Sequence, residues 1–467
     1  MGFRGQDYAF DSPAAAVAGM ISRLADAGAA RPPEAVAIDA ARGRVLAEDV
    51  RADRDSPAFD YSAMDGYAVR AADVEAVWRS AEAGASITLA VVGESRIGAA
   101  PPVLPSEPPG VGVGAAAIRI VTGAAIPQGT DAVVRREDVV EHAEGSAAHG
   151  ERITSISIAP NVAARGGVRV SDNIRRRGEN ARAGDVVLEA GAVLNAAALG
   201  TLAAVGCVRP LVRPRVRVAV ITTGDELVPP EGAPGPYQIR NSNAAVIRAL
   251  LAPWAWIEVV SIPGHPSVHV VDDEGVPDAV LRTAIGHIDA IVLTGGVSMG
   301  HRDPVRAAVE RAGGAGAGKV EIVFHGLPQR PGKPMLGAVV RRAGGATAPQ
   351  PLPPLPIFGL PGNPISAMVT CTRIVLPVLA ALAGASAARA PALGTQGLVR
   401  LANPDGRSLA LWWHRLVRLN AAGEAELIDA RGSGDIIAGG RSDGFIELPP
   451  ASTPAPSALV PFHPWTT

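Results

Sequence analysis

The chain has 467 residues, of which 48% are hydrophobic and 19% charged, and its formal net charge is −2. This length supports roughly two to four domains, and the hydrophobic content excludes global disorder. The near balance of charges predicts no broad basic surface, and therefore no nucleic-acid partner.

The cysteines and the apolar runs bear on the cellular compartment of the protein. Cys207 and Cys371 form no Cys-x-x-Cys pair, so they predict neither a disulfide framework nor a thiolate metal site. The start of the chain lacks the apolar core of a signal peptide. The longest apolar run, Ile374–Ala385, falls short of the ~20 residues of a membrane span and contains Pro377 and Gly384. We therefore expect a cytoplasmic protein without a membrane segment.

The first half of the chain is predicted to be mostly β structure. Apolar residues at helical spacing predict a helix over 12–29, with Ser12 as its N-cap. Short alternating runs from about 45 to 180, separated by Gly and Pro clusters, predict a β-rich domain with little helix. Within it, the stretch 101–114 is typical of an exposed loop. A second helix is expected over 196–205, where it links this domain to the next.

The second half predicts a different architecture. From 215 to about 382, apolar strand-like runs alternate with helical ones, as in a doubly wound parallel sheet. A Pro- and Gly-rich insertion interrupts the alternation at 344–356. The last segment, 397–462, has short strands with Gly turns and predicts a small β domain.

Three fully apolar runs in this second half predict buried strands, Val218–Ile221, Ala290–Leu293 and Ile357–Leu360. Each is followed by a polar, Gly-rich turn. Ligands of parallel sheets bind at the carboxyl ends of the strands, where backbone N–H groups point outward. We expect the three turns to meet at one edge and form one anion-binding site. The substrate-binding residues that they predict are Gly224, Gly295, Gly296, Ser298, Pro361, Gly362, Asn363, Pro364 and Ser366.

Acidic residues accompany these turns. Asp225 and Glu226 would repel a phosphate unless a divalent cation such as Mg²⁺ bridges them to it. Asp289 and Asp303 are expected around the same edge. Asp303 is equally suited to be the N-cap of a helix that begins at Pro304.

Basic residues occur in two places. Arg330 and Lys333 stand in a Pro-flanked turn, which would hold their charges in place. Three consecutive arginines begin at Arg175 and suit a polyanionic ligand, because guanidinium groups match phosphate oxygens. A solvated run of charge is the alternative for these arginines.

Two further turns in the β-rich region contain candidate site residues. Asp65 lies between Met64 and Gly66 just before a strand, and Thr122 precedes Gly123. The Thr122 hydroxyl and nearby N–H groups could bind a phosphate. Plain turn residues are the alternative for both positions.

Seven segments, taken in order, resemble the molybdenum insertase family, the molybdopterin molybdenumtransferases known as MoeA and as the E domain of gephyrin. They span roughly 300 residues and read Ser-Ala-Met-Asp-Gly-Tyr-Ala-Val (62–69), Thr-Gly-Ala-x-Ile-Pro (122–127), Arg-Arg-Arg-Gly-Glu (175–179), Thr-Gly-Asp-Glu-Leu (223–227), Gly-Gly-Val-Ser-Met-Gly (295–300), Pro-Gly-Lys-Pro (331–334) and Leu-Pro-Gly-Asn-Pro-Ile-Ser-Ala (360–367).

The resemblance implies a multidomain α/β plus β fold. Its parts would be a linker and dimerisation domain (1–45 with 182–214), a β-rich domain (46–181), a doubly wound, MogA-like molybdopterin-binding domain (215–388) and a C-terminal β-barrel-like domain (391–467). It also implies a homodimer whose active site joins the α/β domain of one subunit to the β domain of the other. Molybdopterin adenylyltransferase and apo-molybdoenzymes are the protein partners that it suggests.

The implied reaction hydrolyses adenylylated molybdopterin with Mg²⁺, releases AMP and inserts molybdate into the dithiolene. Carried over by position, the acidic metal and substrate groups would be Asp65, Glu226, Asp289 and Asp303. The residues shaping the pterin, phosphate or molybdate sites would be Thr122, Arg175, Ser298, Lys333, Pro361 and Pro364. We take Asp65, Glu226, Asp289, Asp303 and Lys333 as catalytic candidates, Asp65, Asp225 and Glu226 as metal ligands, and Arg330 as a further substrate contact.

Three positions depart from the family pattern. Asn180 and Asn241 stand where relatives commonly have Asp, and Gly326 stands where a lysine is expected. An amide supplies no charge, and losing a lysine would weaken an oxyanion pocket. The alternative function is therefore a non-catalytic or specialised paralogue that binds molybdopterin or a partner protein on the same scaffold.

Overall fold

The computed structural model describes residues 8–24, 31–80, 86–106, 115–144, 152–159, 162, 166–265, 269–270, 278–297, 304–314, 318–342, 352–386, 397–455 and 457–465. By its internal contacts the chain forms two compact units. Unit 1 contains residues 1–49 and 188–467, and unit 2 contains residues 50–187.

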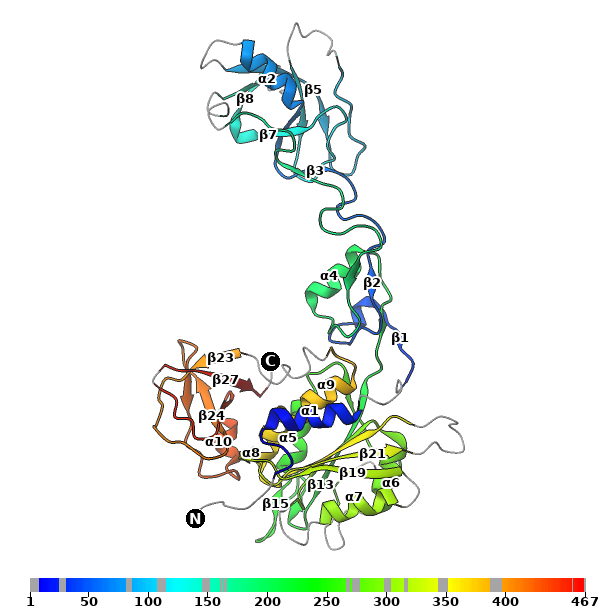
Figure 1. The fold of residues 1–467 in the computed structure, drawn as a ribbon, viewed down its shortest axis with the longest axis vertical. Helices are drawn as coiled ribbons and strands as arrows, with labels where there is room; N and C mark the ends of the chain where they lie inside the picture. The colour runs from blue at the N-terminus through cyan, green and yellow to red at the C-terminus, as the bar shows by residue number, and fades with distance from the viewer. Residues whose placement is uncertain are drawn as a thin grey trace. The chain divides into compact units, whose positions relative to one another are not determined.

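A seven-stranded sheet forms the centre of unit 1 (Figure 1). Its order is β16-β13-β18-β22-β21-β19, and β17 also pairs with β13. The strands are β13 (Val216–Thr223), β16 (Ile257–Val259), β17 (His269–Val270), β18 (Ala290–Thr294), β19 (Gly318–His325), β21 (Leu336–Arg342) and β22 (Leu355–Leu360). The pairs among β16, β13, β18 and β22 are parallel, as the alternation of strands and helices predicts. Strands β21 and β19 add an antiparallel hairpin that the sequence analysis did not predict.

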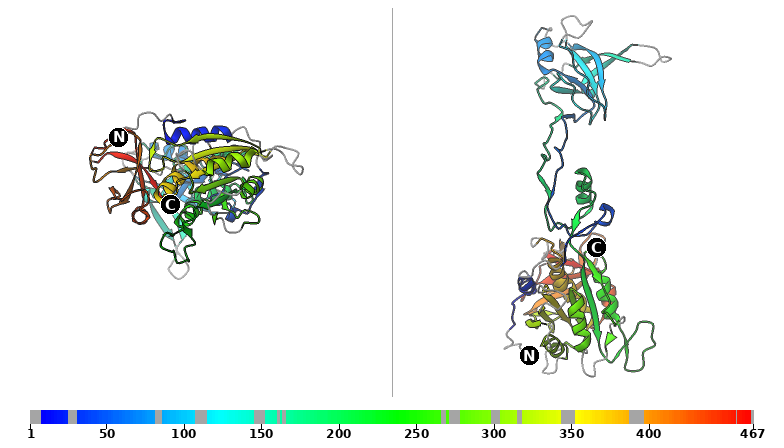
Figure 2. Two further views of the ribbon diagram at one scale, coloured as in Figure 1. Left: turned by 90° about the horizontal axis from the view of Figure 1, so that it is seen from below. Right: turned by 90° about the vertical axis from the view of Figure 1, so that its right-hand side faces the viewer.

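Helices cover both faces of this sheet because β13 is apolar on both sides. Val216, Val218 and Val220 are buried with one helix layer, whereas Ala219 and Ile221 are buried with the other. The first layer contains α1 (Pro13–Leu24), α5 (Ser242–Leu251), α8 (Pro364–Thr370) and α9 (Leu376–Leu382). The second contains α6 (Asp278–His287) and α7 (Pro304–Gly314), and Figure 2 gives two further views of these layers.

A long apolar helix runs without a break from Pro364 to Leu382. The alternation of strands and helices predicts a helix over 366–382, and the structure confirms it. A π-helical turn, Cys371–Val375, precedes Pro377, which stands in the first turn of α9. By length and composition alone the helix could cross a membrane, yet 89% of its apolar window is buried inside the protein. It is a core helix of unit 1.

A second sheet, of six strands, forms the C-terminal part of unit 1, in the order β20-β24-β26-β27-β23 with β25 beside β24. Its elements are β20 (Gln329–Arg330), β23 (Gly397–Arg400), β24 (Trp412–Leu419), β25 (Ala425–Leu427), β26 (Gly444–Leu448), β27 (Leu459–Pro464) and the short helix α10 (Ile436–Gly440). Ile365 and Val369 of α8 are buried against Leu416 and Phe445 of this sheet. Unit 1 also contains β1 (Glu34–Ala35), β12 (Leu211–Val212), β14 (Leu227–Val228), β15 (Ile239–Arg240), the 3₁₀ turn Ile38–Ala40 and α4 (Ala196–Ala204).

Unit 2 is built on a six-stranded sheet of order β7-β4-β6-β5-β9-β8. The strands are β4 (Gly66–Val69), β5 (Ile87–Ser95), β6 (Ala116–Ile120), β7 (Ala132–Arg135), β8 (Val139–Glu144) and β9 (Arg152–Ile158). Helix α2 (Ala71–Ser80) packs against β5 of this sheet and was not predicted. Two short pairs complete the ordered strands, β3 (Tyr61–Ser62) with β10 (Ile174–Arg175) and β2 (Val50–Arg51) with β11 (Val186–Leu188).

A buried ionic cluster ties the core helix to the C-terminal sheet. Arg373 Nε, in the π-helical turn, donates to Glu447 Oε2 at 2.6 Å, and His414 Nε2 lies 3.1 Å from the same oxygen. Burial works to raise the pKa of Glu447, but the hydrogen bond with His414 and the charge of Arg373 outweigh it. They hold the pKa of Glu447 well below its usual 4.5.

We expect Glu447→Ala to lower the free energy of unfolding at neutral pH by about 3–5 kcal/mol, because it leaves Arg373 buried without its carboxylate. The control Glu426→Ala removes an exposed pair with Arg418 and should cost less than about 1 kcal/mol. Because the pKa of Glu447 is lower in the folded protein, the ionised side chain stabilises the fold above its unfolded pKa of 4.5. This contribution to the free energy of unfolding is lost progressively as the pH falls below 4.5. In urea unfolding, the gap between wild type and Glu447→Ala should therefore narrow at pH 3, and an unchanged gap would contradict the assignment.

Candidate active site

Three strand ends lie side by side at one edge of the seven-stranded sheet. Thr222 of β13 pairs with Thr294 of β18, and Thr294 pairs with Leu360 of β22. The prediction that the three Gly-rich turns meet at one edge is therefore confirmed. Strand β21 begins at this edge as well, since Leu336 pairs with Gly359, so the turn before it joins the same site.

Glycine lets the turns pack closely. Gly295 has φ +94°, and a Cβ atom there would lie 2.2 Å from the Thr223 carbonyl oxygen. Its N–H donates to the Leu360 carbonyl at 3.3 Å, and a Cβ at Gly362 would touch the Gly295 Cα at 3.7 Å. Gly296 also has a positive φ, of +63°. A side chain at Gly295 would force the β13 and β18 turns apart.

Asn243 links these turns and was not predicted as a site residue. From the first turn of α5, its Nδ2 donates to Thr294 Oγ1 at 2.9 Å and to the Gly362 carbonyl at 2.8 Å. Among the described residues, Asn243 Oδ1 and Thr223 Oγ1 are buried without a hydrogen-bond partner. Their unused hydrogen-bonding capacity suits a water or a polar ligand edge. Both partners lie far away in the chain, 51 and 119 residues from Asn243, so the local sequence has no signal for this role.

Asn241 explains one departure from the family pattern. Its Oδ1 accepts the Ala244 N–H at 3.1 Å, which caps α5, and its Nδ2 donates to Thr222 Oγ1 at 2.8 Å. An aspartate could cap the helix equally well but could not donate to Thr222. The amide therefore has a structural role at this position.

The two acidic residues after β13 are exposed at the same edge. Gly224 has φ +142°, and a Cβ there would lie 2.7 Å from both carboxylate oxygens of Glu226, so this side chain folds back over the glycine. The Glu226 carbonyl accepts the Ile239 N–H at 2.8 Å, which fixes the backbone beside β15. Asp225 and Glu226 are thus exposed on a turn whose backbone is fixed.

These carboxylates fit the Mg²⁺ that the resemblance implies. They are hard oxygen donors, and Mg²⁺ commonly completes its shell with water and phosphate oxygens. No group of three or more His, Cys, Asp or Glu side chains within the described ranges could hold a metal. Asp65, the predicted third ligand, belongs to unit 2, whereas Asp225 and Glu226 belong to unit 1.

The basic turn before β21 is firmly built. Gln329 is fully buried, and its Nε2 donates to the Gly332 carbonyl at 3.0 Å. A Cβ at Gly332 would lie 2.5 Å from the Thr370 methyl group, so the turn packs tightly on α8. Arg330 is exposed, and the Lys333 Nζ lies 5.9 Å from the centre of the Tyr8 ring.

The turn after β22 leads into α8 with Pro364 at the start of the helix. Asn363 makes no side-chain cap; its Nδ2 donates instead to Ser433 Oγ at 3.0 Å, in the loop before α10. The Ile365 N–H donates to the Ser433 carbonyl at 3.0 Å. Ser366 is buried, so a direct substrate contact is not available to it in this conformation. Ser433 was not predicted.

In unit 2, Asp65 and Thr122 come together as a pair. Asp65 Oδ1 accepts both the Thr122 N–H at 2.7 Å and its hydroxyl at 2.8 Å. These two hydrogen bonds, aided by the charges of Arg136 and Arg119, hold the pKa of Asp65 below its ordinary 3.8. Asp65 is therefore an exposed carboxylate that stays ionised near neutral pH, and it is not a proton donor there.

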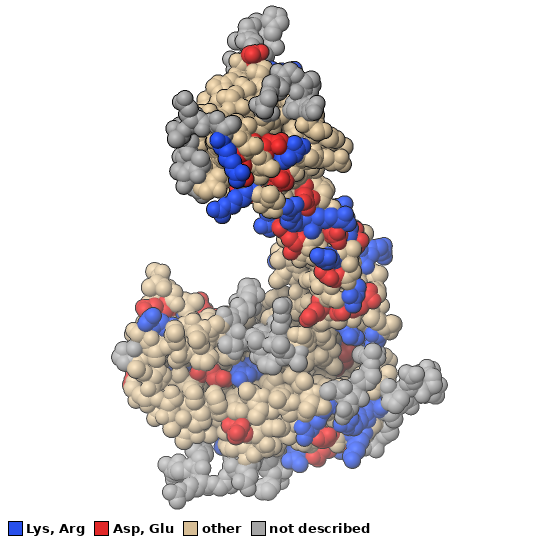
Figure 3. Space-filling view, turned by 45° about the horizontal axis from the view of Figure 1, so that its top comes forward, with Lys and Arg blue, Asp and Glu red and all other residues tan. Residues whose placement is uncertain are grey.

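The three arginines are charge-balanced by neighbours. Arg175 pairs with Glu179, Arg176 Nη1 donates to Asp60 at 2.5 Å, and Arg177 Nε donates to Asp55 at 2.6 Å. On the face shown in Figure 3, basic and acidic side chains are likewise interspersed. These pairs favour the solvated-run alternative over a cluster built for a polyanion.

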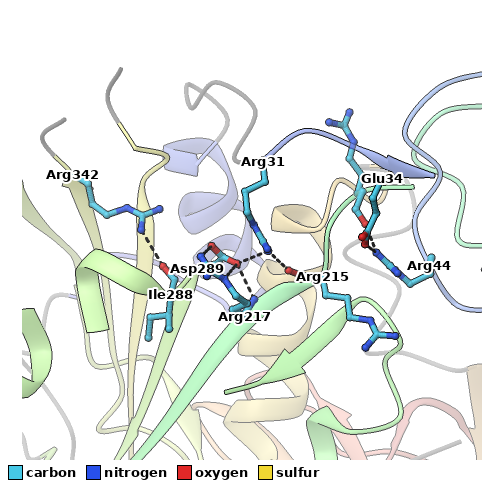
Figure 4. Close-up of polar contacts among 9 residues, drawn as sticks. Arg31, Glu34, Arg44, Arg215, Arg217, Ile288, Asp289 and Arg342 are labelled. Carbon is cyan, nitrogen blue, oxygen red and sulfur yellow. Dashed lines mark hydrogen bonds and ion pairs between the residues drawn. The ribbon is translucent and has the colours of Figure 1, made fainter. Parts of the chain in front are cut away.

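Asp289 lies at the opposite end of the sheet, so its expected place at the ligand edge is wrong. It precedes β18, and its Oδ2 accepts Arg31 Nη2 and the Arg217 backbone N–H, each at 2.9 Å. Figure 4 shows this cluster, with Arg342 donating to the nearby Ile288 carbonyl at 3.0 Å. The reason is directional: a residue before a parallel strand lies at the amino edge.

Two predicted residues and two departures remain. Ser298 and Asp303 lie outside the described residues. Gly326 has φ +96°, a backbone conformation that L side chains rarely adopt, and its N–H donates to the Met335 carbonyl at 2.7 Å. Asn180 is exposed, and its N–H donates to the Ser56 carbonyl at 2.9 Å. The positive φ thus gives a conformational reason for glycine at position 326, which the sequence alone does not reveal.

Two family models match the chain. Residues 12–206 match the MoeA N-terminal region (domain I and II), and residues 219–381 match the probable molybdopterin binding domain. The second match covers the sheet edge described above.

Curated relatives and solved structures agree with these models. The chain is 33% identical over 344 residues to a molybdopterin molybdenumtransferase of Haemophilus influenzae, covering 74% of this chain and 71% of the relative. It is 33% identical over 354 residues to the protein of that name from Nostoc sp., covering 75% and 70%. A crystal structure of a molybdopterin biosynthesis MoeA protein from Pyrococcus horikoshii matches with a TM-score of 0.69 and 23% identity, covering 97% of this chain and 100% of the other. Another structure of that description matches at 0.64 and 26%, covering 98% and 100%. The chain belongs to the molybdopterin molybdenumtransferase (MoeA) family, transferases of molybdenum cofactor biosynthesis.

Proposed function

We propose that the protein is a molybdenum insertase. It takes adenylylated molybdopterin and molybdate, cleaves the adenylylated substrate with water to release AMP, and leaves molybdenum on the dithiolene. The observation that supports this most is the order of groups along one sheet edge. Carboxylates follow β13, glycine turns follow β18 and β22, and the basic turn precedes β21.

This order suits an extended, anionic substrate. Adjacent strands lie about 4.8 Å apart, so the carboxylates after β13 and the cations before β21 are separated by three spacings, or roughly 14 Å. Such a distance suits an adenylylated substrate whose diphosphate lies at the carboxylates while molybdate, the second substrate, lies at the cations. The backbone N–H groups of the intervening turns are available for phosphate oxygens.

Each group has a chemical role in this proposal. Asp225 and Glu226 would hold Mg²⁺, which neutralises phosphate charge when bound. Lys333 and Arg330 attract molybdate and stabilise negative charge that develops during cleavage. Asp65, kept ionised and oriented by Thr122, serves as a carboxylate that positions water or cation. The homodimer, the protein partners and the cytoplasmic location remain predictions from the sequence.

An AMP-release assay tests the function directly. We expect purified protein to release AMP from adenylylated molybdopterin only when Mg²⁺ and molybdate are both present, because charge neutralisation and the acceptor anion are both required. The product should activate a molybdoenzyme that lacks its cofactor. Tight substrate binding without AMP release would instead support the non-catalytic paralogue.

Asp65→Asn tests the carboxylate in unit 2. The amide still accepts from Thr122 but has no charge, so we expect AMP release to fall by at least about 100-fold. The matched control is Asp172→Asn, whose carboxylate also accepts a backbone N–H, from Arg169 at 2.8 Å. It should leave the rate within about twofold. Because the pKa of Asp65 is lowered, the wild-type rate should show no acid limb from this group between pH 5 and 8.

Gly326→Lys and Asn180→Asp test the two departures separately. A lysine at φ +96° should cost on the order of 1–3 kcal/mol of stability without raising the rate. Asn180→Asp is unstrained and exposed, so stability should stay within about 0.5 kcal/mol and the rate should change modestly. Urea unfolding and the AMP assay measure both. A jump from no activity to full activity in either variant would identify the natural protein as a binder.

A further inference from the structure

The segment Tyr8–Ser12 near the start of the chain is fixed at several points. Ser12 Oγ accepts the Ala15 N–H at 3.2 Å and caps α1. The Phe10 ring packs edge-on against Phe324 with centroids 6.1 Å apart, and it fills the space over Gly19, where a Cβ would lie 2.3 Å from it. The segment is therefore a built part of unit 1.

A further contact ties this segment to β24, the strand beside β20, and β20 leads into the basic turn. Trp412 Nε1 donates to the Asp11 carbonyl at 3.0 Å. Trp412 is in turn paired with Gln329 of β20, and its N–H donates to the Pro328 carbonyl at 2.9 Å. The residues that hold Asp11 thus belong to the same framework that holds Arg330 and Lys333.

Tyr8 extends from this fixed segment to the basic turn. Its ring centre lies 5.9 Å from Lys333 Nζ, within the range of a cation–π contact. Both side chains are half-buried, so water screens the contact only in part. An aromatic face attracts an ammonium group without neutralising its charge, whereas a carboxylate at the same place would compete with an incoming anion.

We propose that Tyr8 is a positioning residue that holds the Lys333 ammonium where it binds the tetrahedral oxyanion substrate. This inference rests on the role given to Lys333 in the proposed function. A lysine side chain is long and has many rotamers, so an aromatic contact lowers the cost of ordering it when the anion binds. A contact of this kind is worth about two- to fivefold in a binding constant at a partly exposed site.

A double-mutant cycle tests the proposal on the full chain. Tyr8→Leu should raise the KM for molybdate about two- to fivefold, with the KM for adenylylated molybdopterin unchanged. Tyr8→Phe retains the aromatic face and should match the wild type. In a Lys333→Gln background, Tyr8→Leu should have no further effect, because Tyr8 acts through the ammonium group.

Three results would overturn the proposal: an equal effect of Tyr8→Leu with and without Lys333, a matching rise in the KM for adenylylated molybdopterin, or a Tyr8→Phe variant that behaves like Tyr8→Leu. Calorimetric measurement of molybdate binding, without the other substrate, distinguishes failure of this proposal from failure of the proposed function. If the wild type binds molybdate but releases no AMP, the same cycle run on the dissociation constant still decides the role of Tyr8. If Lys333→Gln leaves molybdate binding unchanged, Tyr8 has no such role.

Discussion

The parallel register of β13, β18 and β22 is the constraint on which the site depends. It brings Thr222, Thr294 and Leu360 level with one another, so the turns after them begin at the same height. The close approach of Gly295 to the Thr223 carbonyl then leaves no room for a side chain between two of these turns. Asn243 bridges β18 to the turn after β22 from a helix that Asn241 caps. The edge is thus a rigid framework of backbone and short polar side chains, to which the charged groups are attached.

Charge in this protein is mostly used in pairs. Asp289 is held by Arg31 and Arg217, and the three arginines that begin at Arg175 each have an acidic partner. The exposed Asp225 and Glu226 lie on a turn at the carboxyl edge of the sheet, where the proposed function has a cation and a phosphate bind. A charged residue in the sequence therefore indicates function only when its position along a strand is also known.

Strands and helices with strong periodicity could be predicted from the sequence, and so could the gathering of the three turns. The prediction that Asp289 lies at the ligand edge was wrong because it ignored strand direction: Asp289 precedes β18 and lies at its amino end. Asn243 and Ser433 were missed because their roles depend on contacts with segments far away in the chain, Gly362 and Asn363 respectively. The positive φ of Gly326 likewise follows from the loop between β19 and β21, a hairpin that the apolar pattern alone does not reveal.

The core helix from Pro364 to Leu382 has a consequence for how the protein is made. Ile365 and Val369 are covered by Leu416 and Phe445, which are synthesised later. At about 5–20 residues per second, the roughly 76 residues between Val369 and Phe445 take some 4–15 s to follow. During that interval on the ribosome, the face of this helix that contains Ile365 and Val369 lacks its cover, and Arg373 lacks Glu447. An apolar patch of the nascent chain therefore stays exposed until its last sheet is completed.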